Sequence, residues 1–198
     1  MQYVDAGGGN ALQLRHPGSF VGLFVATSTN HSELRGIVTR WQWSPGCGIA
    51  SNTEHFAADP ELQDAYWTAL ECHAKMTGTM SNLSLELHAE DREFLQDKRF
   101  SLTGASLGLS MLLGLICYHA GRPWPPGMFA WGNIRPVRDG RFGLYAVDHI
   151  DDKLAVARSA GLRHLVHPEE EGTLLRAARE TLVPRNVTLD ALDSALKH

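Results

Sequence analysis

The sequence has few cysteines, little excess charge and no long apolar run. Its three cysteines are scattered and form no CxxC pair, which argues against a disulfide framework and against a zinc ribbon; they are Cys47, Cys72 and Cys117. The formal net charge of −4 provides no attraction for nucleic acid or for an anionic membrane surface. We therefore expect reduced cysteines, no metal or organic cofactor, no nucleic-acid partner and no membrane partner.

Signatures of membrane insertion, secretion and nucleotide hydrolysis are missing as well. The longest apolar stretch, Leu107–Ala120, is interrupted by polar residues and is shorter than the ~18 apolar residues of a transmembrane helix. The first ten residues, MQYVDAGGGN, have neither the basic nor the apolar region of a secretion signal, so we expect a cytoplasmic protein. No GxxxxGK(S/T) motif occurs, and the sequence therefore carries no P-loop ATPase of its own.

The composition, with 43% hydrophobic and 20% charged residues, is typical of one globular domain. We expect a flexible lead-in over residues 1–19 and one domain over residues 20–198. Apolar and β-branched residues predict strands over Phe20–Thr27, Leu34–Trp43, Leu83–His88, Met128–Ile134, Val137–Val147 and Leu162–His167, and Asp139-Gly140 predicts a hairpin turn. Helical spacing and capping residues predict helices from Pro60 to the residue before Gly78, and over Leu109–Ala120, Lys153–Ala160, Glu169–Leu182 and Leu189–Leu196. The charged stretch Glu90–Arg99 is expected to be a surface loop, and the fold class is α+β (mixed α/β).

Ser106 and Lys153 are the residues whose positions suggest chemistry. Ser106 lies between small residues at the start of an apolar helix, where free N–H groups can stabilise a developing negative charge. Lys153 lies in the first turn of its helix, where the helix dipole disfavours a cation and favours the neutral amine that a general base requires. The alternatives are a serine that caps its own helix and a solvated lysine paired with Asp151 or Asp152.

The order of four segments resembles the proteolytic domain of Lon proteases. In that family a G-P-S-A-G-type loop leads into a helix ending in T-G-x-P, and a strand with M-T-G-E-I and a segment G-G-(L/I)-x-x-K-x-x-A-A follow. The corresponding segments here are Thr103–Gly108, Ala120–Pro123, Met128–Ile134 and Asp148–Ala157. The resemblance implies a single Lon proteolytic-domain-like fold, related to the ribosomal protein S5 domain 2-like superfold.

The resemblance also implies a site. Ser106 matches the family's nucleophile and Lys153 its general base, which together hydrolyse peptide bonds through an acyl-serine intermediate. Support of the dyad or of the oxyanion hole is expected from Gly104, Ala105, Trp131 and His149. Activity should rise with pH, because the lysine must be neutral to act as a base.

The implied function is that of an ATP-independent serine endopeptidase acting on flexible or unfolded proteins, with no metal or organic cofactor. Because family members work as rings, a homo-oligomer is expected, and an ATPase or adaptor would be a separate partner.

Several motif positions differ from the family pattern. Trp131 stands where the family has a threonine that supports the lysine, Asn133 replaces a glutamate, Asp148-His149 replaces Gly-Gly, and Thr103 replaces an acidic residue. These differences raise the alternative of a catalytically impaired Lon-like domain that serves as an assembly or peptide-binding module. A third alternative is a GHMP-type small-molecule kinase, because Gly104–Ser110 is loosely similar to the phosphate-binding loop of those enzymes.

Overall fold

The computed structural model describes residues 4–5, 14–28, 31–50, 60–98, 100–101, 105–136, 142–145, 147–162 and 164–166. The helices expected over Glu169–Leu182 and Leu189–Leu196 lie outside these residues, as do Thr103 and Gly104. Within the expected lead-in, Val4–Asp5 form strand β1, which pairs in parallel with Ile37 and Val38.

Two long antiparallel strands form the centre of the main sheet. They are β2 (Ser19–Ser28) and β3 (His31–Pro45), which pair from Ser19 opposite Gln42 to Thr27 opposite Leu34 before the register shifts. Both expected strands are confirmed. They form here because their β-branched and aromatic residues suit a pleated surface with one buried face. The sheet order is β4-β5-β3-β2-β6, with β4 over Gly48–Ala50, β5 over Leu83–Leu87 and β6 over Phe100–Ser101.

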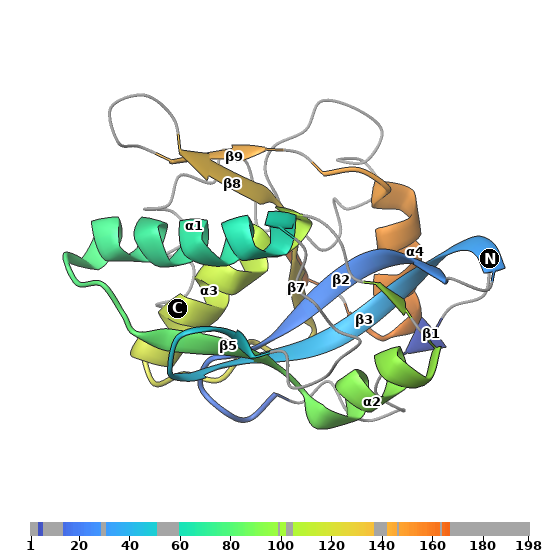
Figure 1. Cartoon of the computed structure of the whole chain (residues 1–198), viewed down its shortest axis with the longest axis horizontal. Coiled ribbons are helices and arrows are strands. Elements are labelled where there is room, and N and C mark those ends of the chain that lie inside the picture. Colours follow the sequence, from blue (N-terminus) through green and yellow to red (C-terminus); the bar gives the residue numbers. More distant parts are fainter. Residues whose placement is uncertain are drawn as a thin grey trace.

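Helices cover this sheet at two places (Figure 1). Helix α1 (Pro60–Thr77) packs on α3 (Gly108–His119), and α3 in turn packs on β2. Helix α4 (Ile150–Ser159) packs on β3 and β2. The core between these layers contains four fully buried tryptophans: Trp41, Trp43, Trp124 and Trp131. No helix among the described residues is both long and apolar enough to cross a membrane.

Two smaller strand pairs complete the described fold. Strand β7 (Met128–Ala130) pairs in parallel with β10 (His164–Val166), and β8 (Asn133–Pro136) pairs with β9 (Phe142–Tyr145) as an antiparallel hairpin. The mixture of parallel and antiparallel strands with four α-helices in the described residues confirms the α+β class.

The expectation of a surface loop over Glu90–Arg99 is wrong, because α2 spans Ala89–Lys98. Its acidic residues Glu90 and Asp91 lie in the first turn, where the helix dipole favours negative charge. Asp91 is fully buried and accepts hydrogen bonds from the Arg40 backbone N–H at 2.5 Å and from Arg40 Nη2 at 2.6 Å. Arg40, 51 residues earlier in the sequence, therefore holds this charged helix against the sheet through its hydrogen bonds to Asp91.

The strand expected over Met128–Ile134 is interrupted. The structure divides it into β7 and β8, with Trp131 and Gly132 between them. At this break the backbone of Gly132 makes its hydrogen bonds to the segment that contains Ser106 instead of to a neighbouring strand. The interruption thus connects the two strands to the candidate site.

Candidate functional site

Ser106 lies in a single 3₁₀ turn, η1 (Ala105–Leu107), directly before α3. The Gly132 N–H donates a hydrogen bond to the Ser106 carbonyl at 3.0 Å, and the Leu109 N–H donates to the Gly132 carbonyl at 3.0 Å. These two bonds hold the turn against the break between β7 and β8, while the Ser106 side chain is half-buried. The cap of α3 is Leu107 and no side chain caps the helix, so Ser106 is not a helix-capping serine.

Small residues allow the start of α3 to lie close to the segment between β7 and β8. A Cβ atom added at Gly108 would lie 3.3 Å from the Ile134 backbone nitrogen and 3.4 Å from the Gly132 carbonyl oxygen. One turn later the buried Ser110 hydroxyl donates to the Ala130 carbonyl at 2.7 Å. The start of α3, directly after Ser106, is therefore held against both β7 and β8.

Lys153 lies in the first turn of α4 and is only 5% exposed. Its backbone N–H donates to the His149 carbonyl at 3.1 Å. The buried face of α4 consists of Lys153, Leu154, Val156 and Ala157, so the lysine points into the protein with the apolar residues. Lys153 is thus not a solvated surface lysine.

Gly36 on β3 allows α4 to lie close to the sheet. A Cβ atom added at Gly36 would lie 2.0 Å from Val156 Cγ2 and 3.5 Å from the Asp152 carbonyl oxygen. Since real Cβ contacts are never so short, the packing of α4 on β3 requires glycine here. The burial of Lys153 depends on this contact, because Lys153 and Val156 share the buried face.

His149 precedes α4 in a backbone conformation that favours glycine. Its φ of 56° and ψ of 41° lie in the left-handed region, and it is the only non-glycine residue with positive φ in the described part of the chain. The side chain is exposed, and its Nδ1 lies 3.8 Å from Asp152 Oδ2. The imidazole therefore faces the first turn of α4 from outside the core.

Trp131 is fully buried and packs on Phe129, with ring centroids 5.6 Å apart and planes at 60°. It would therefore support the site by packing. The structure brings Ser106 against Trp131-Gly132, and it brings His149 against the start of α4. Ser106 and Lys153 lie on different elements, η1 and α4, and both elements contact β2. Gly104 lies outside the described residues, and Ala105 is described only as part of η1.

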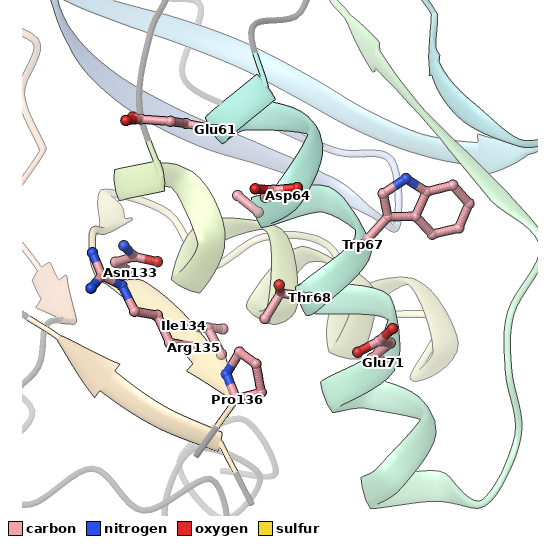
Figure 2. A pocket seen from close by; sticks show the side chains of 10 residues that line it. Glu61, Asp64, Trp67, Thr68, Glu71, Asn133, Ile134, Arg135 and Pro136 are labelled. Carbon is pink, nitrogen blue, oxygen red and sulfur yellow. The ribbon is translucent and has the colours of Figure 1, made fainter. Parts of the chain in front are cut away.

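The sequence patterns did not predict a pocket of about 530 Å³ between α1 and β8 (Figure 2). Helix α1 contributes Glu61, Asp64, Ala65, Trp67, Thr68 and Glu71, and β8 contributes Asn133, Ile134, Arg135 and Pro136. Figure 2 shows Asp64, Thr68 and Glu71 on one side and the β8 side chains on the other. Polar residues at helical spacing on α1 were a usable signal, but the opposite wall comes from a distant part of the chain.

The pocket adjoins the turn that contains Ser106. Turn η1 contacts both α1 and β8, the two walls of the pocket. Asn133, which lines the pocket, directly follows Gly132, whose N–H is bonded to the Ser106 carbonyl. The pocket therefore lies beside the turn that contains Ser106.

A half-buried serine before one helix and a buried lysine in the first turn of another are residue types that acyl transfer uses, and the structure places them on separate elements, η1 and α4. Within the described residues no three His, Cys, Asp or Glu side chains are grouped to hold a metal ion. Comparison of the sequence with protein-family models and with curated proteins finds no significant match.

Proposed function

We propose that the chain is a Lon-like serine endopeptidase that cleaves flexible or unfolded proteins without ATP. Ser106 is the nucleophile and Lys153 the general base. The observation that carries the proposal is the burial of Lys153 in the first turn of α4. Desolvation and the positive end of the helix dipole both favour a neutral amine, and a neutral amine can accept a proton.

In the proposed reaction, Lys153 Nζ takes the proton from Ser106 Oγ as this oxygen attacks the peptide carbonyl. The oxyanion is assigned to backbone N–H groups at the start of η1 and α3 other than that of Leu109, which donates to the Gly132 carbonyl. The amine product leaves with the proton returned by Lys153. Water then hydrolyses the acyl-serine, with Lys153 again acting as base.

The proposal includes a Lon-like fold, and the backbone at His149 supports it. The family motif has glycine at the position that His149 occupies, and His149 takes a left-handed conformation that normally favours glycine. The order of elements from the serine turn onward also supports it: η1, α3, β7, the β8–β9 hairpin, α4 and β10, with α2 and β6 between β5 and the serine turn.

The location and partners belong to the same proposal. All three cysteines are free, which fits a reducing cytoplasm. Assembly into a homo-oligomeric ring and delivery of substrates by a separate ATPase or adaptor rest on the family resemblance.

Degradation of casein by the full chain in the absence of ATP tests the proposal. We expect Ser106→Ala and Lys153→Met to lose at least about 100-fold in rate, since each removes one member of a unit that acts together. Methionine keeps the buried stem volume of the lysine. Ser159→Ala and Lys75→Met, at exposed positions, are the matched controls and should keep the activity. Unchanged cleavage in either dyad variant would refute the proposal.

The second candidate is an assembly or peptide-binding module without turnover. It is favoured by Trp131, which is apolar and fully buried where the family has a supporting threonine. A folded wild-type chain that binds casein but neither cleaves it nor reacts with a serine-directed acylating probe would establish this module instead.

A further inference from the structure

The described lining of the pocket between α1 and β8 has more negative than positive side chains. Glu61, Asp64 and Glu71 all line it from one helix, and no ion pair to any of them occurs among the described residues. Arg135, the one cationic side chain among the described lining residues, lies over the Tyr145 ring with its guanidinium carbon 5.3 Å from the ring centroid. Three carboxylates and one arginine give the described lining a formal net charge of −2.

The same pocket offers apolar surface for the stem of a long side chain. Trp67 lines it and is 46% exposed, although large aromatic side chains are usually buried. The Tyr66 ring packs edge-on against it, with ring centroids 4.9 Å apart and planes at 75°. A volume of about 530 Å³ is ample for one or two side chains of a bound peptide.

An aromatic face beside carboxylates suits a cation on an aliphatic stem. The methylene groups of lysine or arginine can pack on Trp67, while the charged end reaches Asp64 and Glu71. An acidic or purely apolar side chain would lack this match, because it would bring no positive charge to the carboxylates.

We infer that this pocket binds a lysine or arginine side chain of the peptide substrate, near the bond presented to Ser106. The inference rests on the proposed function in naming the ligand a substrate, and it adds a preference for basic segments. Asn133, which lines the pocket, directly follows Gly132, whose N–H donates to the Ser106 carbonyl, and this neighbourhood is the reason for assigning the basic residue to a position near the scissile bond.

Binding to the full-length Ser106→Ala chain separates recognition from cleavage. The probe is a fluorescein-labelled flexible peptide with one central lysine, and the reference is the same peptide with uncharged norleucine in its place. Fluorescence anisotropy should give a Kd at least fivefold lower for the lysine peptide, and the difference should shrink as salt is raised. Equal Kd values for the two peptides would overturn the inference.

Variants of the pocket locate the binding. Asp64→Asn combined with Glu71→Gln should raise the Kd of the lysine peptide at least fivefold and leave that of the norleucine peptide unchanged. Glu93→Gln, an exposed carboxylate on α2, is the matched control and should change neither. A lysine-peptide Kd unaffected by the double substitution would overturn the inference.

Cleavage by the wild-type chain distinguishes failure of the pocket inference from failure of the proposed peptidase function. If the chain cleaves casein through Ser106 but cuts the lysine and norleucine peptides equally well, the pocket inference fails and the peptidase stands. If the lysine peptide binds through Asp64 and Glu71 but Ser106 has no activity, the basic-residue pocket stands and the peptidase fails.

Discussion

Replacing Gly36 by alanine should displace α4 from β3 and move Lys153 with it. The added methyl would lie 2.0 Å from Val156 Cγ2 and 3.1 Å from Val156 Cβ. Val156 is buried and β-branched in a helix, where one χ1 rotamer is strongly preferred, so it cannot swing away. We expect the free energy of unfolding to fall by roughly 1–3 kcal/mol, the usual cost of overpacking.

A second substitution should restore the packing. Val156→Ala removes the side-chain methyl that the methyl introduced by Gly36→Ala would strike, although alone it leaves a small cavity and lowers stability. In the Gly36→Ala/Val156→Ala double variant the new methyl partly fills that cavity. The double variant should therefore be more stable than the sum of the two single changes predicts, by roughly 1–3 kcal/mol.

Urea unfolding followed by circular dichroism measures these energies, and casein cleavage measures the consequence for the site. Gly36→Ala alone should lose activity beyond its loss of folded protein, and the double variant should recover most of it. Gly36→Ala combined with Leu87→Ala on β5 is the control pair and should be additive. Additive energies for Gly36→Ala and Val156→Ala would refute the account of how α4 is held.

Three further predictions concern buried charge. Burial, and then repulsion from His119, lowers the pKa of His73 from 6.5 to about 4, so between these values the unfolded chain binds a proton that the folded chain excludes. The free energy of unfolding should therefore fall as pH drops through this window. Urea unfolding should show a loss between pH 7 and pH 5 that is about 2 kcal/mol larger in the wild type than in His73→Phe. Parallel pH profiles of the two proteins would contradict this. Asp91→Ala leaves the Arg40 guanidinium buried without its closest carboxylate and should lower the free energy of unfolding by roughly 3–5 kcal/mol in the same assay. Glu90→Gln changes an exposed partner of Arg40 and should leave the urea midpoint nearly unchanged. Similar urea midpoints for both variants would contradict this prediction. Peptidase activity should rise with pH between mildly acidic and alkaline conditions because Lys153 must lose its proton to act as base, and a flat profile of kcat/KM would count against that role.

Local patterns were sufficient to predict most of the described elements. The β-branched runs around Phe20 and Val38, and the apolar helix after Ser106, form as expected because their preferences are decided by neighbours in sequence. The hairpin between Pro136 and Phe142 was likewise expected from its Asp-Gly turn signal, although the turn residues themselves lie outside the described part of the chain.

Features that depend on distant residues were not predictable from such patterns. Helix α2 is docked by the contact between Asp91 and Arg40, and the burial of Lys153 depends on Gly36, more than a hundred positions earlier. The pocket needs Asp64 on α1 and Arg135 on β8 to face each other. Sequence spacing carries no information on such pairs, because only the folded sheet brings them together.

Covalent labelling of Ser106 tests the central claim most directly. The full-length chain is treated with a serine-directed fluorophosphonate, and adducts are located by intact mass and peptide mapping. The account predicts one adduct, on Ser106, that is lost in Lys153→Met and retained in Lys75→Met. A folded wild-type chain that forms no adduct on Ser106, or an adduct that forms equally fast without Lys153, would contradict it.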